Sequence, residues 1–520
     1  MNQVGYFLIR NAQAFPDRVA LIFQDQKVTW QELNMVANRL ANSMKKLGIK
    51  KGDRITYMFP NCLEILYIWY ATQKIGATAV PLNTHLLPDE IIRTIQQADS
   101  HTLLYHENYK DKMPEVKEKT DLAHVICCGS TIGAGEQDLK VLLEEGAGEE
   151  AQVPMKGTDE SLLLFTSGTT GISKGVIRSQ QVIRDYALMM ALENDNSHRT
   201  EILLTHCPLF HTAGMSLVMK MAALSGTLVL QNKLNYRDVL RQIEEYKVTQ
   251  ILLIPPLLYM NFSEVDQWKN YDLSSVKEAQ FSGGKCTLEY AKGIFEVFPE
   301  CSIRVSWGST ETCSPTSAVL TRSQIQEDPE RIHCVGKQNA LVELRLVNEA
   351  GEDVAQGEVG EAIVRSPMVF EGYLNCPELS EKAFRDGWFY TEDLMKKDEE
   401  GYYYLMDRKR DIIKTGGENV YAQEVERVLC EHEAIRECAV IAVADHRFGE
   451  AVAAAIVLNP GAVLTEEEIT EYCKNKMPSY KKPRYIAFLS DLPRNSIGKL
   501  QKSVLREKSK EIFGAEAFCN

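Results

Sequence analysis

The stretch Leu162–Val176, LLLFTSGTTGISKGV, decides the fold of this chain. An apolar run predicts a buried strand, which enters a loop of hydroxyl residues and glycines that Lys174 and Gly175 close. Hydroxyl groups, a lysine and backbone N–H groups that glycines allow to turn inward together form a cradle for phosphate oxygens. The loop is not a Walker A loop, because Ser173 stands where that motif needs its second glycine. An ordinary polar surface turn is the alternative interpretation.

Length and charge limit what the chain can be. With 520 residues it is too long for one ordinary core, so we expect two or more domains. A formal net charge of −14 argues against nucleic acid as a general partner, since phosphate backbones are bound by excess lysine and arginine. The start of the chain lacks a long apolar core, which argues against a secretory signal. The run Val248–Met260 is broken by prolines and predicts a buried strand entering a loop, not a membrane span.

The cysteines indicate a reducing compartment. The chain has 13 of them, an odd number without a C-x-x-C pair, which suits no disulfide framework. We expect reduced thiols, most of them buried like small hydrophobic side chains. The predicted location is therefore the cytoplasm.

Strands and helices alternate up to about residue 320. Residues Thr29–Glu32 match a capping box, after which apolar residues recur at helical spacing until Gly48 ends the helix. The elements expected next are a strand at 55–59, a helix at 64–75 and a strand at 77–81. This alternation is typical of a layered α/β domain with a largely parallel sheet. Residues 129–150, rich in glycine and glutamate, are expected to form a solvated connection.

The pattern changes beyond residue 340. A smaller β unit is expected first, and a compact α+β domain follows from Asp411. The elements expected there are strands at 342–347, 360–365, 437–443 and 452–457, a helix marked by Val425, Val428 and Leu429, and a helix capped by Thr465 and Glu468. The charged segment 407–411 is the predicted boundary.

Five further segments are hard to explain by packing alone. They are Pro208–Gly214 (PLFHTAG), Ser306–Glu311 (SWGSTE), Gly387–Asp393 (GWFYTED), Asp407–Val420 (DRKRDIIKTGGENV) and Pro493–Lys499 (PRNSIGK). In this order, together with the opening loop, they resemble the adenylate-forming superfamily of acyl- and aryl-CoA ligases, amino-acid adenylation domains and luciferases. The resemblance implies an N-terminal adenylation domain at 1–408, a mobile C-terminal domain at 409–520 with its hinge at Arg410, and an active site between them.

The resemblance also implies roles for individual residues. ATP, Mg²⁺ and coenzyme A are the expected cofactor and co-substrates. Phosphate and nucleotide contacts are assigned to Thr166, Ser167, Gly168, Thr169, Thr170, Gly171, Lys174, Gly283, Gly284, Lys285, Trp307, Gly308, Ser309, Thr310, Asp393 and Arg408. Thr166 and Glu311 would support Mg²⁺, a hard ion that prefers oxygen ligands.

Two groups would then act in turn at one site. Lys499 matches the lysine that bridges the carboxylate and the α-phosphate during adenylation. In the second step the C-terminal domain swings, and the loop with Gly416 and Gly417 replaces Lys499 to leave room for a pantetheine arm. His211 lies where the family places a residue beside the acyl pocket, and a histidine satisfied by its own loop is the alternative.

Four positions depart from the family pattern. Ser173 replaces a proline, which should leave the phosphate loop less rigid. Trp307, which is expected to stack on adenine, stands where the family usually has tyrosine or phenylalanine and so lacks the tyrosine hydroxyl. Glu392 replaces a glycine beside Asp393, and Arg410 is charged like the usual hinge residue.

The leading hypothesis is an ATP-dependent acid–CoA ligase acting on a fatty or other apolar carboxylic acid. The chain ends shortly after Lys499, which favours a diffusible thiol over a fused carrier domain. An aromatic or carnitine-like acid and a separate carrier protein remain alternatives, as does a nucleotide sensor without turnover. An amino acid is less favoured, because no acidic residue stands where it would hold an amino group. A homodimer is also possible.

Overall fold

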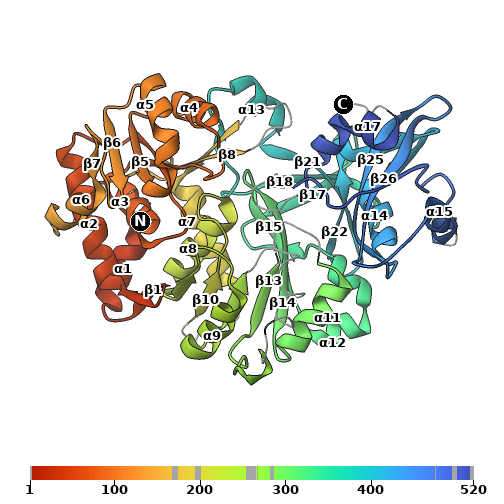
Figure 1. Cartoon of the computed structure of the whole chain (residues 1–520), viewed down its shortest axis with the longest axis horizontal. Helices are drawn as coiled ribbons and strands as arrows, with labels where there is room; N and C mark the ends of the chain where they lie inside the picture. The colour runs from red at the N-terminus through yellow and green to blue at the C-terminus, as the bar shows by residue number, and fades with distance from the viewer. Residues whose placement is uncertain are drawn as a thin grey trace. The chain divides into compact units, whose positions relative to one another are not determined.

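The computed structural model describes residues 3–166, 174–193, 201–252, 265, 268–281, 286–474, 476–494 and 500–515. The chain forms two compact units. Unit 1 comprises residues 1–343 and 364–389, and unit 2 comprises residues 344–363 and 390–520. Strands and helices alternate through unit 1, as the labels in Figure 1 show. The predicted α/β class, with a smaller C-terminal α+β part, is confirmed.

One sheet of unit 1 has nine strands. Its order is β16 (Lys337–Gln338), β15 (Cys313–Leu320), β14 (Ser302–Ser309), β13 (Glu278–Phe281), β12 (Gln250–Leu252), β10 (Ile202–Thr205), β11 (Thr227–Leu230), β1 (Val19–Phe23) and β2 (Gln26–Thr29). The six strands from β14 to β1 in this order are parallel, while β15, β16 and β2 are antiparallel to their neighbours. The largely parallel sheet is confirmed.

A second sheet of unit 1 has eight strands. Its order is β19 (Gly372–Tyr373), β9 (Lys174–Ser179), β8 (Glu160–Thr166), β4 (Thr78–Pro81), β3 (Arg54–Met58), β5 (Thr102–His106), β6 (His124–Cys128) and β7 (Gln137–Asp138). The predicted strand before the phosphate loop is β8, and β9 returns antiparallel to it with Thr166 opposite Lys174. The two ends of the loop are therefore fixed side by side in the sheet.

Helices cover both faces of this sheet. The α-helices described in unit 1, which include those on the other sheet, are α1 (Tyr6–Ala14), α2 (Trp30–Lys46), α3 (Leu63–Ile75), α4 (Pro88–Gln97), α5 (Met113–Lys119), α6 (Leu139–Glu145), α7 (Gln180–Leu192), α8 (Thr212–Leu224), α9 (Tyr236–Tyr246), α11 (Leu288–Val297), α12 (Arg322–Glu327) and α13 (Pro377–Ala383). Strand β5 shows how the faces separate: Leu103 and Tyr105 pack in the cluster with α4 and α5, while Leu104 packs in the cluster with α2 and α3. Alternating side chains of a strand point to opposite faces.

The capping box predicted at Thr29 is present at the start of α2. Glu32 N donates to Thr29 Oγ1 at 3.2 Å, and Thr29 N donates to the Glu32 carboxylate at 2.8 Å. A box of this kind satisfies two of the N–H groups that a helix start leaves without partners. The helix ends at Lys46, and Gly48 has φ of 89°.

The prediction of a solvated connection at 129–150 is wrong in part. The segment contains strand β7 and helix α6, which Asp138 caps by accepting from Lys140 N at 2.8 Å. The side chain of Glu136 is 2% exposed, and its carboxylate pairs with Lys117 at 2.7 Å and accepts from the Tyr105 hydroxyl at 2.8 Å. The short apolar run that begins at Leu139 supplies a buried helix face, which the glycines and glutamates around it obscure.

Another sheet has five strands, and the division into units falls within three of them, β17, β18 and β21. The strands are β17 (Glu343–Val347), β18 (Gly360–Arg365), β21 (Trp388–Lys397), β20 (Phe384–Arg385) and β22 (Tyr403–Arg408). Two of these strands are those predicted at 342–347 and 360–365, which confirms a smaller β unit.

The C-terminal part of unit 2 is the predicted α+β arrangement. Its elements are β23 (Ile412–Thr415), β24 (Glu418–Tyr421), α14 (Ala422–Cys430), β25 (Ile435–Asp445), β26 (Gly449–Leu458), α15 (Glu466–Lys474), β27 (Tyr485–Phe488), α16 (Lys502–Glu507) and α17 (Ser509–Phe513). Along β25, Val440 packs with α14 and α15, whereas Ile441 packs in the cluster that contains Leu505 of α16. Thr465 caps α15 as predicted.

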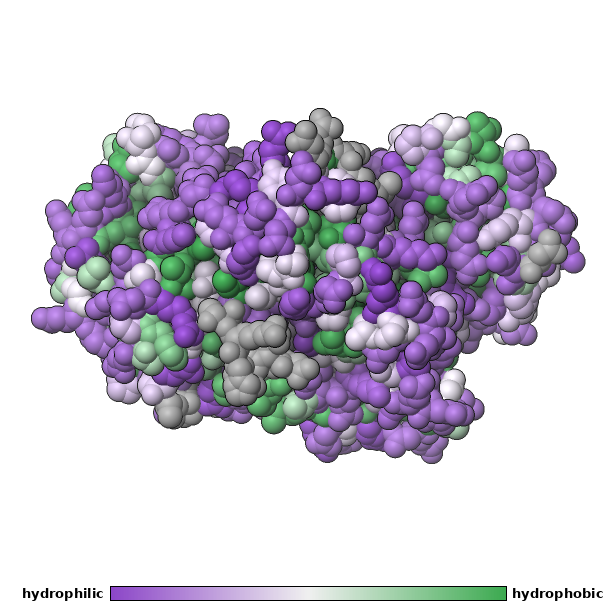
Figure 2. Space-filling model, turned by 90° about the horizontal axis from the view of Figure 1, so that it is seen from below, coloured by the Kyte–Doolittle hydropathy of each residue, from purple (hydrophilic) through white to green (hydrophobic). Residues whose placement is uncertain are grey.

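Hydrophobic side chains are mostly buried in these cores. On the face drawn in Figure 2, polar residues predominate and the hydrophobic ones form small separate patches. Among the described residues, no helix is both long and apolar enough to cross a membrane. Most of the described cysteines are buried, as predicted, with Cys376 and Cys430 exposed.

Candidate active site

The motif SWGSTE comprises the last four residues of β14 and the first two residues of the turn that leads to β15 in unit 1. The pairing shifts register between Trp307 and Ser309, so Gly308 lies at an irregularity of the hairpin. A Cβ on Gly308 would lie 1.6 Å from the Cys313 carbonyl oxygen, which no neighbour can relieve because that atom is backbone. Gly308 is therefore required by close backbone packing. The Trp307 side chain is buried, with 6% exposure.

Two hydroxyl side chains hold this turn in shape. Ser309 Oγ accepts from the backbone N–H of Glu311 at 3.2 Å and from that of Thr312 at 3.3 Å. Thr312 Oγ1 in turn accepts from Ser309 N at 3.1 Å. Side-chain bonds of this kind replace the backbone bonds of a regular turn. Ser309, predicted to contact nucleotide, thus has a structural role in fixing Thr310 and Glu311.

Thr310 is joined to two other elements of unit 1. Its carbonyl oxygen accepts from Arg178 Nε at 3.0 Å and also from a terminal nitrogen of the same guanidinium. Its hydroxyl accepts from Thr212 Oγ1 at 3.2 Å, at the first residue of α8. Arg178 lies in β9, the strand that follows the phosphate loop, and is 1% exposed. One arginine therefore ties the strand after the loop to the turn that carries Thr310.

Glu311 and Lys174 both contact the same aromatic residue, Tyr373. The Glu311 carboxylate accepts from the Tyr373 hydroxyl at 3.1 Å, and the Glu311 carbonyl oxygen accepts from Phe370 N at 2.8 Å. The ammonium of Lys174 lies 5.4 Å from the centre of the Tyr373 ring, within the range of a cation–π contact. The predicted phosphate ligand Lys174 and the predicted magnesium ligand Glu311 thus share Tyr373 as a neighbour.

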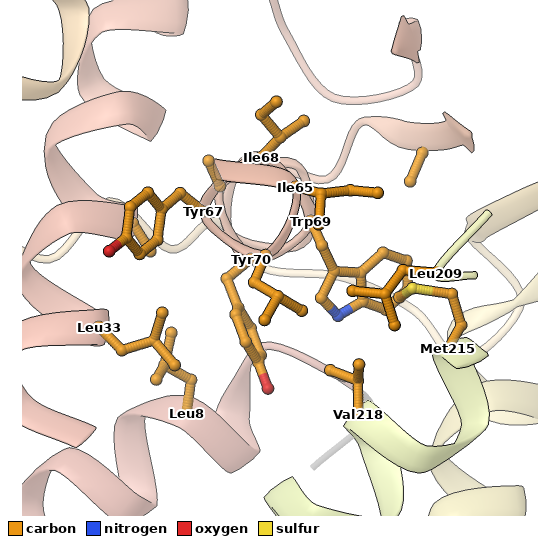
Figure 3. Close-up of a cluster of buried hydrophobic side chains, with 14 of the residues drawn as sticks. Leu8, Leu33, Ile65, Tyr67, Ile68, Trp69, Tyr70, Leu209, Met215 and Val218 are labelled. Atoms are coloured by element: carbon orange, nitrogen blue, oxygen red, sulfur yellow. The ribbon is translucent and has the colours of Figure 1, made fainter. Parts of the chain in front are cut away.

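His211 occupies the N-cap position of α8 without a side-chain capping bond, and the nearby Leu209 and Met215 are buried in the hydrophobic core. Figure 3 shows Leu209 and Met215 next to Trp69 of α3, within one buried cluster. Burial lowers the pKa of His211 to about 4, so its imidazole is neutral near pH 7. Within the described part of the chain, His211 Nε2 is buried and meets no hydrogen-bond partner. In the described part of the chain, the loop of His211 therefore leaves this ring nitrogen without a hydrogen-bond partner.

Asp393 and Arg408, the predicted ribose ligands, face each other in unit 2. They are opposite residues of the antiparallel strands β21 and β22, and Arg408 Nε lies 3.2 Å from Asp393 Oδ1. Asp393 N donates to Thr391 Oγ1 at 3.1 Å. The Asp393 carboxylate is nearly buried, while Arg408 is about one-third exposed, at 38%. The pair is therefore built into the sheet.

Glu392 replaces the glycine of the family pattern, and its backbone shows why glycine is usual there. Its φ is 61°, in the left-handed region that side chains disfavour. Its N–H donates to the Glu361 carboxylate at 3.2 Å. Within β21 the chain keeps the left-handed backbone conformation that a glycine adopts readily, and Asp393 retains its pairing with Arg408 despite the added side chain.

Gly416 and Gly417 form the two-residue turn between β23 and β24. Thr415 pairs with Glu418 across the hairpin, and φ is 60° at Gly416 and 88° at Gly417. Positive φ at both central residues is what type I′ hairpin turns require. Nothing lies within 4 Å of a Cβ built on Gly417. These glycines are thus required by backbone dihedral angles, with open space beside Gly417.

The remaining predicted residues lie outside the described ranges. They are Ser167, Gly168, Thr169, Thr170, Gly171, Ser173, Gly283, Gly284, Lys285 and Lys499. Thr166, at the end of β8, is described, and its hydroxyl lies 3.5 Å from the Lys174 carbonyl oxygen.

Family models match most of the chain. The model "AMP-binding enzyme" matches residues 8–374, and "AMP-binding enzyme C-terminal domain" matches residues 424–499. The chain belongs to the AMP-binding enzyme family. It is an acid–thiol ligase of the AMP-forming, acyl-CoA synthetase type, and the resemblance to adenylate-forming enzymes is confirmed.

Curated relatives of this AMP-binding enzyme align over nearly all of both chains. The long-chain-fatty-acid–CoA ligase FadD13 of Mycobacterium tuberculosis is 30% identical over 513 residues, covering 98% of this chain and 99% of the relative. The 2-succinylbenzoate–CoA ligase of Bacillus subtilis is 32% identical over 511 residues, covering 97% and 98%.

Solved structures show the same fold. The anthranilate CoA ligase AuaEII in complex with anthranoyl-AMP matches with a TM-score of 0.89 at 26% identity, over 98% of this chain and 97% of that one. The O-succinylbenzoate coenzyme A synthetase of Bacillus subtilis in complex with ATP and a magnesium ion matches with a TM-score of 0.82 at 30% identity, over 95% and 98%.

Two residues that connect the predicted site residues of this AMP-binding enzyme, Arg178 and Tyr373, lie outside the sequence motifs. Arg178 directly follows the apolar pair Val176 and Ile177 in β9, and its burial requires a fixed partner. Tyr373 stands in no phosphate-type motif, so only the fold reveals its contact with Glu311. Thr212 belongs to the motif PLFHTAG, from which no role was predicted for it. Its hydroxyl donates to the Thr310 hydroxyl and so helps to position that residue.

Proposed function

We propose that the chain is an ATP-dependent acid–CoA ligase that forms an acyl-adenylate and then a thioester, on a fatty or other apolar carboxylic acid. The observation that carries this proposal is the Arg178–Thr310 contact. It fixes the strand that follows the phosphate loop against the turn that bears the predicted α-phosphate donor. Loop and turn belong to one compact unit, as a pocket for a nucleoside triphosphate requires.

The chemistry explains why these groups are needed. A carboxylate resists attack by a thiol because it is anionic and has no good leaving group, and transfer to the α-phosphate of ATP supplies AMP as that group. This step brings two anions together, so cations and N–H donors must be fixed where charge accumulates. Lys174 and the Thr310 hydroxyl are the described groups for this task. Lys499 would bridge the two anions, and it would give way to the turn with Gly416 and Gly417 in the second step.

The residues present fit Mg²⁺. Thr166 and Glu311 offer a hydroxyl and a carboxylate, the hard oxygen donors that this ion prefers. Among the described residues, no group of three or more histidine, cysteine or acidic side chains could hold a metal by itself. Such a sparse set suits an ion that keeps water and substrate phosphates in its shell. Mg²⁺ would neutralise phosphate charge, while Tyr373 orients the Glu311 carboxylate.

The surroundings of His211 favour an apolar acid. Phe210 lies against the imidazole with ring centres 4.7 Å apart, and both Phe210 and Met215 are buried. Because the pKa of His211 is about 4, the imidazole offers no positive charge to a second carboxylate near pH 7. An aromatic acid is the second candidate, because AuaEII is named for anthranilate and a relative from Amycolatopsis is named feruloyl-CoA synthase.

One experiment tests both the reaction and the acid class. The purified enzyme is incubated with a panel of fatty, aromatic, dicarboxylic and carnitine-like acids, and exchange of labelled pyrophosphate into ATP is measured. AMP release is then followed with coenzyme A present. We expect exchange with apolar acids and AMP release that depends on coenzyme A. Exchange without coenzyme A-dependent turnover would indicate a carrier protein, and no exchange with any acid would indicate a nucleotide sensor.

A further inference from the structure

Two thiols of unit 2 lie unusually close together. Cys430 is the last residue of α14 and Cys438 lies in β25, and their Sγ atoms are 3.5 Å apart. Cys430 is exposed, whereas Cys438 is buried with 8% exposure. One thiol can therefore be reached by a dissolved reagent, and the second lies within reach of the first.

The local fold suits a bond between the two sulfurs. A disulfide has an S–S distance of about 2 Å, so the Sγ atoms need to approach by about 1.5 Å. Cys430 ends its helix, and helix ends are the part of a helix that shifts most readily. Cys438 is held in the long β25–β26 hairpin, opposite Ile456. The exposed partner is thus the one placed to move.

We propose that Cys430 and Cys438 form a reversible dithiol site that reacts with small disulfides such as oxidised glutathione. The Cys430 thiolate attacks one sulfur of the reagent, forming a mixed disulfide and releasing one glutathione thiolate. The Cys438 thiol, after losing its proton to solvent, then attacks Cys430 Sγ and releases the second glutathione. Two protein thiols are oxidised and one glutathione disulfide is reduced to two thiols, so electrons and protons balance.

Nothing in this site overlaps the residues assigned to adenylation. Cys438 Sγ lies 3.5 Å from the Glu426 carbonyl oxygen, and the Glu426 carboxylate pairs with Lys502 of α16 at 2.7 Å. The disulfide would therefore link α14 to β25 next to the contact that holds α16. The inference stands independently of the proposed function.

The sequence provides a direct test. Trypsin cleaves after Arg427, Arg436 and Arg447, which places Cys430 and Cys438 in two separate peptides. The whole enzyme is treated with oxidised glutathione at about pH 8, where part of the thiols ionises, then alkylated, digested and analysed by mass spectrometry. We expect a cross-linked pair of the peptides 428–436 and 437–447 that disappears after reduction.

Three variants separate the steps. Cys438→Ser should trap glutathione on Cys430, because the resolving thiol is gone, and Cys430→Ser should leave Cys438 unmodified. Cys376→Ser removes the other exposed cysteine of the described residues and should leave the cross-link unchanged. The oxidised wild type should also unfold at a higher temperature than the reduced form, since the bond closes a loop in the unfolded chain. A stable glutathione adduct on wild-type Cys430, or no cross-linked peptide, would overturn the inference.

Discussion

Two turn regions of this enzyme contain glycines that other residues cannot easily replace, and the physical reason differs between the two. At the turn between β14 and β15 in unit 1, Gly308 is required by space, because a Cβ would collide with the Cys313 carbonyl. At the turn between β23 and β24 in unit 2, Gly417 is required by its φ of 88°, and the space beside it is open. A motif alone makes the two glycines look alike. Close backbone packing makes the first turn rigid. In the second turn, the positive φ of Gly417 is the constraint that favours glycine.

The largest effect is expected at the first turn. In Gly308→Ala the added carbon cannot be accommodated without moving backbone, so we expect a loss of about 4 kcal/mol or more in the free energy of unfolding. Pyrophosphate exchange should be abolished. The measurements are thermal denaturation and acid-dependent exchange. Gly148→Ala is the control, because a Cβ there meets only Met35, at 3.9 Å. A stable, active Gly308→Ala enzyme would show that the turn is not rigid.

At the second turn, the effect of a substitution should depend on how well the new residue tolerates positive φ. Gly417→Leu places a branched side chain at positive φ, which costs about 1–2 kcal/mol, and it fills the open space. We expect thioester formation from supplied acyl-adenylate to fall more than tenfold, with pyrophosphate exchange intact. Gly417→Asn should retain most of the thioester activity, since asparagine tolerates this conformation. Equal loss in the Asn and Leu variants would mean that space, not φ, matters here too.

The third prediction concerns His211, which lies beside the first turn through its neighbour Thr212. Because folding lowers its pKa from 6.5 to about 4, the folded state binds its proton less readily than the unfolded state. The stability it contributes is full above pH 6.5 and is lost as the pH falls toward 4, by up to about 3 kcal/mol. His211→Gln should show a weaker loss of unfolding free energy on acidification.

Urea denaturation at about pH 7 and about pH 5 measures this difference. Part of the acid sensitivity should remain in the His211→Gln variant, because burial also lowers the pKa of His206 to about 4. An unchanged pH dependence in the variant would show that His211 is not desolvated in the folded enzyme.

The smallest effect is expected at Glu392, the residue that adopts a glycine-like φ in unit 2. Glu392→Gly removes the strain of the left-handed conformation but frees the unfolded chain, so the net gain is at most about 1 kcal/mol. Thermal denaturation should show a small rise in melting temperature, with Glu399→Gly as an exposed control. A clear loss of stability in Glu392→Gly would mean that its side chain holds the strand.

The sequence predicts much of this fold because its signals are local. The capping box at Thr29 and the strand before the phosphate loop depend on neighbouring residues, and both are present. Helix α6 was missed, because its short apolar run is surrounded by glycines and glutamates.

The site was predictable only where its chemistry lies within motifs. Thr310 and Glu311 stand in such a motif, whereas Arg178 and Tyr373 reach them across 132 and 62 residues of sequence. Contacts at this separation are set by the packing of strands, and single-sequence patterns do not encode them.

The central claim is that Lys499 serves the first half-reaction and the turn with Gly417 serves the second. The most direct test compares Lys499→Ala with the wild type in both half-reactions, with Lys508→Ala as an exposed control. We predict that pyrophosphate exchange falls by about 10²–10³-fold in Lys499→Ala. Thioester formation from supplied acyl-adenylate should stay near the wild-type rate. An equal loss of both half-reactions would contradict the account.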